Sequence, residues 1–272
     1  MVNSQCNAQY HMDDLLEIMK TLRAPGGCPW DREQTHQSIR QNMLEEAYEA
    51  ADAIDHGDME NLKEELGDVL LQVVFHARMA QEAGQFTFDD VVDGVCRKLV
   101  YRHPHVFGTV EAEDAQGALS TWDAQKRREK GQRTTADAMD CVARAMPALM
   151  RAEKIQGKAR KAGFDWEEVS PALDKLSEEA LELRQAVLEH SNVEEELGDV
   201  LFAAVKVGRF AGVDSETALQ KACEKFISRF RRVEQLAQEP LTELDVPELE
   251  RLWRRAKMEE RGQEEAQDLK AP

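Results

Sequence analysis

The chain has 272 residues, of which 42% are apolar, and a formal net charge of −18 at pH 7. Its length allows two domains, each with its own core. The negative charge argues against a nucleic-acid-binding protein, because affinity for polyphosphate backbones depends mainly on lysine and arginine. No apolar stretch approaches the roughly 20 residues that span a bilayer, and the polar N-terminus lacks the pattern of a signal peptide. We therefore expect a cytoplasmic protein that binds neither nucleic acid nor a membrane.

Apolar residues at three- or four-residue spacing fill most of the chain, and the alternation typical of strands is absent. The pattern predicts an all-α fold, with helices at residues 13–22, 41–55, 59–83, 88–101, 118–130, 145–162, 171–189, 193–211, 215–236 and 246–261. Polar residues interrupt this pattern after Gly131, which predicts an inter-domain linker at residues 131–145. The expected domains are residues 12–130 and 146–262.

The chain contains an internal repeat, because the sequence EELGDVL occurs at Glu64–Leu70 and again at Glu195–Leu201. A second acidic segment precedes each copy, LEEAYEA at Leu44–Ala50 and SEEALEL at Ser177–Leu183. After each copy come a pair of basic residues and then a tryptophan with a lysine, all at i, i+4 spacing. These residues are Lys98 with Arg102 and Trp122 with Lys126 in the first repeat, and Lys225 with Arg229 and Trp253 with Lys257 in the second. We infer a tandem repeat of two helical bundles.

The acidic residues are spaced so that they share helix faces. The pairs are Glu46 with Glu49, Glu65 with Asp68, Glu179 with Glu182, and Glu196 with Asp199. A short turn near Gly57 or Ser191 makes each pair of helices antiparallel, so their carboxylates should face each other. One like-charged pair costs roughly 4 kcal/mol at about 4 Å and an effective dielectric of about 20. A bound cation relieves this repulsion, and oxygen ligands favour Mg²⁺, Ca²⁺ or Mn²⁺, with Mg²⁺ typical of phosphate chemistry.

Two other classes of protein compete with a metal-dependent enzyme of phosphate chemistry. A non-enzymatic acidic helical interaction or regulatory protein explains the charge, since acidic helix faces are usually only solvated, but it leaves the repeated basic and Trp/Lys pairs unexplained. A di-iron carboxylate oxidoreductase requires Glu-x-x-His on its metal helices. No such motif is present, because His76 lies roughly 16 Å beyond Glu65 along the helix axis.

The combined motif E-E-x-x-E and E-x-x-D resembles the MazG family of all-α nucleoside triphosphate pyrophosphohydrolases, as do Gly27-Cys28-Pro29-Trp30-Asp31 and Gly163-Phe164-Asp165-Trp166. The resemblance implies a tandem of MazG-like helical-bundle domains, in a homodimer that cleaves nucleoside triphosphates to monophosphate and pyrophosphate. It implies Mg²⁺ as cofactor, with Mn²⁺ as a possible substitute. In the family pattern the ligands are the second and third Glu of the first motif and both acids of the second. On this chain they are Glu46, Glu49, Glu65, Asp68, Glu179, Glu182, Glu196 and Asp199.

The same resemblance suggests roles for the remaining groups. Glu178 and Glu195 are candidate general bases beside the metal ligands. Lys225, Arg229 and Lys257 are expected to neutralise the leaving pyrophosphate, and Trp253 to stack on the base, which predicts broad base specificity. Lys98, Arg102, Trp122 and Lys126 are the corresponding substrate-binding candidates of the first repeat.

The two repeats differ at one position beside the ligands. Lys175 precedes Glu179 by one helical turn and places a cation there, whereas the first repeat has neutral Asn42 at the corresponding position. We therefore expect the second domain to be the main catalytic one.

Overall fold

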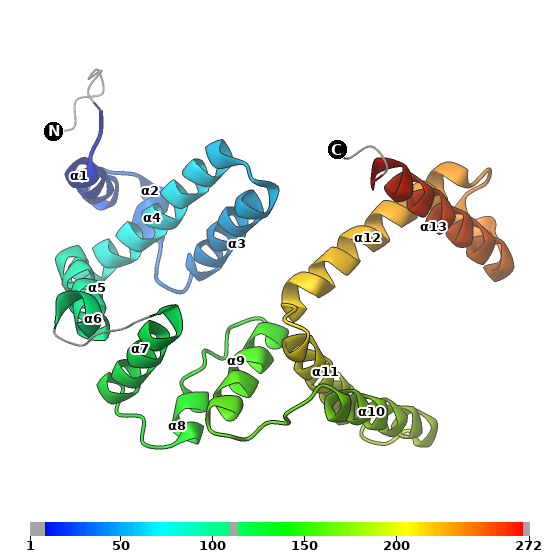
Figure 1. Ribbon diagram of the computed structural model, residues 1–272. Helices are drawn as coiled ribbons and strands as arrows, with labels where there is room; N and C mark the ends of the chain where they lie inside the picture. The colour runs from blue at the N-terminus through cyan, green and yellow to red at the C-terminus, as the bar shows by residue number, and fades with distance from the viewer. Residues whose placement is uncertain (1–8, 109–113, 269–272) are drawn as a thin grey trace. The chain divides into compact units, whose positions relative to one another are not determined.

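The computed structural model describes residues 9–108 and 114–268, and every regular element in these ranges is helical (Figure 1). The all-α prediction is therefore confirmed. In chain order the helices are α1 (Met12–Arg23), α2 (Pro29–Glu33), α3 (Arg40–His56), α4 (Met59–Glu82), α5 (Phe88–Arg102), α6 (Pro104–Phe107), α7 (Ala115–Glu129), α8 (Thr135–Asp140), α9 (Ala148–Lys161), α10 (Ser170–Glu189), α11 (Val193–Phe210), α12 (Ser215–Leu236), the 3-10 helix η1 (Leu241–Glu243) and α13 (Val246–Asp268).

The long helices lie where the apolar periodicity predicts them, but α2, α6 and α8 were not expected. Both α2 and α6 start with a proline, at the position where the missing N–H costs no hydrogen bond. In α8 the hydroxyl of Thr134 accepts a hydrogen bond from the backbone N–H of Asp137, and Ala138 is buried. The segment interpreted as a linker thus contains a helix, which packs on α9.

The chain forms two compact units, one ending at Lys126 and one beginning at Arg127, so the boundary falls within α7. Each unit holds one copy of the repeat. The domain limits at 12–130 and 146–262 stay a prediction. None of the described helices has the length and apolar composition needed to cross a membrane.

In the first unit, α3 and α4 pack side by side as an antiparallel pair (Figure 1). Gly57 closes α3 with a φ of 67°, a left-handed conformation that favours glycine. Asp58 then caps α4 by accepting a hydrogen bond from the backbone N–H of Asn61. The core of this unit lies beneath α4 and consists of Met19, Ile39, Val74, Phe75 and Met79. Burial of these side chains fixes α4 against α1 and the segment that leads into α3.

In the second unit, α10 and α11 form the corresponding antiparallel pair, and α9 packs on α11. The Nε2 of Gln156 on α9 donates to the carbonyl oxygen of Phe202 on α11 at 2.8 Å. Helices α12 and α13 pack on each other and are joined by ion pairs from Arg229 to Glu260 and from Arg232 to Glu259. The second acidic helix pair is therefore also fixed by packing.

Candidate functional site

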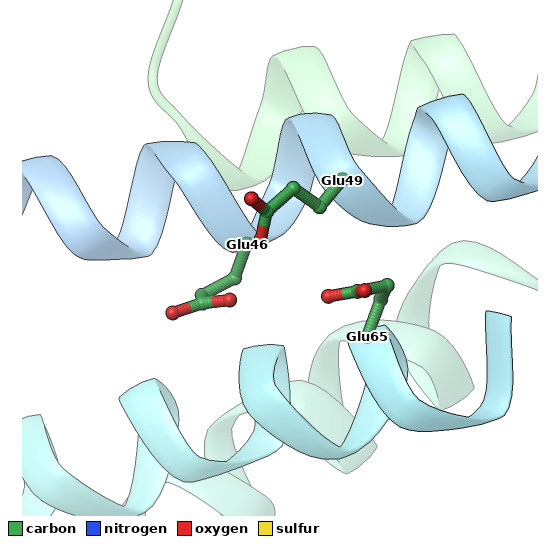
Figure 2. Close-up of side chains that lie close together, drawn as sticks. All are labelled: Glu46, Glu49 and Glu65. Atoms are coloured by element: carbon green, nitrogen blue, oxygen red, sulfur yellow. The ribbon is translucent and has the colours of Figure 1, made fainter. Parts of the chain in front are cut away.

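The structure brings three carboxylates together in the first unit. Glu46 and Glu49 extend from α3 towards Glu65 on α4, and one oxygen of each lies within 4.8 Å of one oxygen of each of the others (Figure 2). We call these residues the first acidic cluster. Glu46 and Glu65 are half-buried and Glu49 is exposed. The cluster therefore lies at the surface, where a small ligand can reach it.

Proximity changes the acidity of this cluster. Burial raises the pKa of Glu46, and the negative charges of Asp68 and Glu49 raise it further. Burial and the charges of Glu49 and Asp68 likewise raise the pKa of Glu65. Asp68 is not within the group of three, but its charge acts on two of its members. The four predicted ligands of the first repeat therefore belong to one electrostatic unit.

The second unit gathers a different set of the predicted ligands. Glu179 on α10 and Glu196 and Asp199 on α11 have one carboxylate oxygen each within 4.8 Å of one another. We call these residues the second acidic cluster. Glu182 lies outside the group of three, but it shares a hydrogen bond with Glu179, and this bond and burial raise the pKa of Glu182. Glu179 is 7% exposed, so its charge needs a partner.

Lys175 supplies that partner. Its Nζ lies 2.6 Å from Glu179 Oε1 and 2.9 Å from Glu178 Oε1. The hydrogen bond from Lys175 holds the pKa of Glu179 below its usual range despite burial, and the two carboxylates raise the pKa of Lys175. Glu179 of the second acidic cluster thus has a cation held beside it. No such ion pair is present at Asn42 in the described part of the first unit.

The two candidate general bases lie beside the second acidic cluster rather than in it. Glu178 is bound to Lys175. Glu195 accepts a hydrogen bond at 3.3 Å from the side-chain amide of Asn192, which also donates to Glu196 Oε1 at 2.8 Å. Asn192 was not singled out in the sequence. Its position immediately before α11 was the available signal, because asparagine at such a position can bond to the residues that follow.

The basic and tryptophan residues of the first unit form one stack. The buried guanidinium of Arg102 on α5 lies 5.1 Å from the ring centre of Trp122 on α7, and Lys126 Nζ lies 4.6 Å from the same ring. Both cations are within cation–π range. Lys98 is half-buried one turn before Arg102. Arg102 of the first pair therefore meets Trp122 and Lys126 of the second pair in space.

The corresponding residues of the second unit are arranged differently. Trp253 on α13 packs against Phe226 on α12, with ring centres 5.1 Å apart, and Arg229 pairs with Glu260. Lys225 and Lys257 are exposed. In the described residues none of these side chains contacts the second acidic cluster, which is built by α10 and α11 alone. Among the described residues, Lys175 is therefore the basic group that the structure places at the second acidic cluster. The substrate-binding roles of Lys225, Arg229, Trp253 and Lys257 stay a prediction.

The donor set of both clusters fits a hard divalent cation. All ligands are carboxylate oxygens, and no histidine or cysteine joins either group among the described residues. The raised pKa values of Glu46, Glu65 and Glu182 show that these acids resist simultaneous ionisation, which is the condition that a cation relieves. The absence of an imidazole ligand also disfavours a di-iron site of the Glu-x-x-His type.

Comparison with known proteins supplies independent information. The MazG nucleotide pyrophosphohydrolase domain matches this chain twice, at residues 34–107 and 161–233. The nucleoside triphosphate pyrophosphohydrolase of Escherichia coli (strain K12) is 46% identical over 257 residues, covering 92% of this chain and 98% of that protein. The nucleoside triphosphate pyrophosphohydrolase/pyrophosphatase MazG of Thermotoga maritima is 43% identical over 249 residues, covering 90% and 95%. A crystal structure of a MazG-related protein from Thermotoga maritima covers 43% of this chain and 99% of its own, with 27% identity and a TM-score of 0.37.

Proposed function

The chain belongs to the MazG nucleotide pyrophosphohydrolase family, and from that premise we propose that it hydrolyses nucleoside triphosphates to monophosphate and pyrophosphate at its acidic clusters. The observation that carries the proposal is the position of the clusters. Both lie inside the segments matched by the family domain, and both gather carboxylates from two antiparallel helices. A non-enzymatic interaction protein would not need this arrangement twice.

Carboxylates of both repeats hold a divalent cation in the proposal, Mg²⁺ with Mn²⁺ as a substitute. The residues are Glu46, Glu49, Glu65 and Asp68 in the first unit, and Glu179, Glu182, Glu196 and Asp199 in the second. The all-oxygen donor set supports this choice of metal. When bound, the cation neutralises phosphate charge and makes a bound water more acidic.

The chain's own residues orient the substrate and move the proton. Lys175, beside Glu179, donates hydrogen bonds to the triphosphate. Glu195 is the better candidate for the general base, because Glu178 is engaged by the cation of Lys175, while the side-chain partner of Glu195 in the described part of the chain is the neutral amide of Asn192. The attack of water on the α-phosphorus breaks its bond to the bridging oxygen, and pyrophosphate leaves with that oxygen.

The proposal includes a homodimer. Helices α10 and α11 expose large apolar side chains, among them Leu181, Leu188, Leu197, Leu201 and Phe202. Large exposed apolar side chains that gather into one patch mark an interaction site, and the proposal is that a second copy of the chain covers these. A second copy that covers it would also bring in further side chains near the second acidic cluster. In the proposal, pyrophosphate is bound by Lys225, Arg229 and Lys257, and the base by Trp253. The homodimer would bring these side chains to the acidic cluster.

The decisive experiment is hydrolysis of a panel of NTPs and dNTPs with Mg²⁺ in ¹⁸O-labelled water. We expect monophosphate and pyrophosphate, with the label in the monophosphate, because water attacks the α-phosphorus. Diphosphate with orthophosphate would contradict the proposed reaction, and label in pyrophosphate would contradict the point of attack. Similar rates across bases would support broad specificity, which stays a prediction together with the cytoplasmic location and the absence of nucleic-acid and membrane partners.

A further inference from the structure

Each acidic helix pair is joined covalently at only one end. Gly57 and Asp58 link α3 to α4, and residues 190–192 link α10 to α11. At the other end of each pair, the segment that leads into the first acidic helix has no covalent link to the second. The spacing of the carboxylates therefore depends on what holds this open end together.

In the first unit, a pair of histidines bridges the open end. His36, in the segment before α3, and His76 on α4 have their Nδ1 atoms 2.8 Å apart. Their rings are parallel, with planes 2° apart and centres 5.1 Å apart. One Nδ1 must carry a proton and donate it while the other accepts. Only a pair with at least one neutral ring can make this bond.

The environment of His76 favours its neutral form. Its Nε2 is buried without a hydrogen-bond partner, and burial together with the charge of His36 lowers its pKa. Several charged groups of α4 and of α1 and α5, which pack on it, already have partners. Arg23 and Arg78 both pair with Glu82, Lys20 pairs with Glu17, and Asp90 accepts hydrogen bonds from Thr87. Arg40 begins α3 and Asp89 lies at the start of α5. None of these groups forms an ion pair with either imidazole.

In the second unit, ion pairs bridge the open end. Asp165, in the segment before α10, lies 2.9 Å from Lys206 Nζ and 2.6 Å from Arg209 Nη2, both on α11. The side chains of Asp165 and Arg209 are 10% and 9% exposed. Although burial raises the pKa of Asp165, hydrogen bonds from Lys206 and Arg209 lower it overall. Lys206 also lies 4.7 Å from the ring centre of Trp166.

The two bridges are not copies of each other. At the same offset from the repeated EELGDVL, the second repeat has Val207 where the first has His76. Lys206 and Arg209, which form the second bridge, correspond to Phe75 and Arg78. The two units thus bridge the open end with different residues at neighbouring positions of the second acidic helix. We propose that each bridge is a clasp that positions the first acidic helix of its unit, and that acid opens the His36–His76 clasp while the Asp165 clasp stays closed.

The consequence of acid follows from charge. When both imidazoles are protonated, the acceptor is lost and two positive charges lie within hydrogen-bonding distance of each other. The segment before α3 then loses its hydrogen bond to α4 and is held there by apolar packing alone, so the spacing of Glu46 and Glu49 from Glu65 becomes less fixed. Asp165 keeps its charge over the same pH range, because its pKa is lowered.

Hydrogen exchange of the full-length protein tests the proposal directly and does not depend on activity. Amide exchange is measured by mass spectrometry at about pH 8 and about pH 4.5, and corrected for intrinsic rates. The lower value lies about two units below the usual histidine pKa of about 6.5, so that a pair with a lowered pKa also takes up its second proton. We expect exchange in residues 35–45 to become several-fold faster at the lower pH, while residues 163–175 stay equally protected. Equal protection of residues 35–45 at both values would overturn the proposal.

Variants separate the clasp from a general effect of acid. His76→Phe keeps an aromatic ring but removes one titrating group, so exchange in residues 35–45 should lose its pH dependence. His56→Gln is the matched control, because His56 is an exposed histidine of the same unit whose pKa is raised by its hydrogen bond to Asp52. The His56→Gln variant should keep the wild-type pH dependence of exchange in residues 35–45. Loss of this pH dependence in both variants would contradict its assignment to His76.

Two further measurements keep the test decisive. If the His76→Phe variant does not fold, NMR titration of the wild-type imidazoles takes its place. The His36–His76 pair should take up its second proton below the usual histidine range. Two independent titrations within that range would overturn the clasp. Asp165→Asn should make residues 163–169 exchange several-fold faster at about pH 8, and Asp165→Glu should recover part of the protection. An unchanged Asp165→Asn would contradict the second clasp.

Discussion

At the scale of single residues, environment gives chemically identical glutamates opposite properties. Glu46 has carboxylates around it and a raised pKa, whereas Glu179 has Lys175 at 2.6 Å and a lowered pKa. The sequence predicted the cation beside Glu179, because a one-turn spacing on a helix fixes the distance between two side chains. It did not predict the contact of Asn192 with Glu196, which depends on how the turn before α11 folds.

The first prediction concerns the metal-free stability of the first acidic cluster. A carboxyl whose pKa is higher in the folded chain than its usual 4.5 destabilises the fold above its folded pKa, and this penalty disappears as pH falls through that value. Glu46→Gln should therefore raise the free energy of unfolding at about pH 7.5 in the presence of a chelator. The gain should disappear at about pH 4, and urea unfolding at the two pH values measures it. A loss of stability at neutral pH would show that Glu46 is not strained by its neighbours.

The second prediction concerns turnover by the second acidic cluster. Glu179→Gln or Asp199→Asn should lower kcat/KM by more than about 100-fold, because even partners of metal ligands typically contribute 10- to 100-fold. Glu194→Gln is the matched control, since Glu194 is an exposed acid on α11, the helix of Asp199, and lies outside the cluster. It should keep near wild-type activity. Circular dichroism should show all three variants folded, and full activity of Glu179→Gln would remove it from the proposed ligands.

At the scale of helices, periodicity predicted where the long elements lie but not what they contact. The apolar faces of residues 215–236 and 246–261 predicted two helices, and both are present as α12 and α13. The pairing of Arg229 with Glu260 was not predictable, because spacing on one helix says nothing about the facing helix. Single-turn helices such as α2 were missed for a related reason. One turn is too short to show a period.

The third prediction contrasts the helix starts of α11 and α12. Asp214 caps α12 by accepting a hydrogen bond from the backbone N–H of Thr217, so Asp214→Ala should cost about 1 kcal/mol of unfolding free energy. Asn192 precedes α11 without a cap bond, and its amide instead orients Glu195 and Glu196. Asn192→Ala should therefore cost less stability but weaken Mg²⁺ affinity by about 10-fold or more. Chemical unfolding measures the loss of stability, and calorimetric titration measures the loss of Mg²⁺ affinity. If Asn192→Ala cost more stability than Asp214→Ala and left Mg²⁺ affinity unchanged, Asn192 would serve the helix rather than the site.

At the scale of the whole molecule, the repeat predicted a tandem of helical bundles, and the domain matches support it. The sequence did not reveal how far the two copies have diverged. Trp122 contacts the cations of Arg102 and Lys126, whereas Trp253 packs on Phe226. The open ends of the acidic helix pairs use different clasps. The two units share the motif that forms the acidic helices, but the residues that pack around these helices differ between them.

This divergence leads to the fourth prediction, that most hydrolysis resides in the second unit. In the proposed reaction Lys175 would donate a charge-assisted hydrogen bond to the triphosphate that Asn42 would not, a difference of about 1.5–3 kcal/mol. The raised pKa of Glu46 also means that a proton competes more strongly with the cation in the first unit than at Glu179.

Matched double variants test the asymmetry between the units, because each variant removes one negative charge from each of the two acidic helices of its unit. Glu49→Gln with Asp68→Asn should leave most activity, while Glu182→Gln with Asp199→Asn should abolish it. Asn42→Lys should give the first unit part of the contact that Lys175 makes in the second. Added to the Glu182→Gln/Asp199→Asn variant, it should therefore raise the residual kcat/KM, by up to about 10-fold for about 1.4 kcal/mol. Equal losses from the two double variants would show that both units work alike. That result would overturn the asymmetry, while the pyrophosphohydrolase reaction itself would stand on its products.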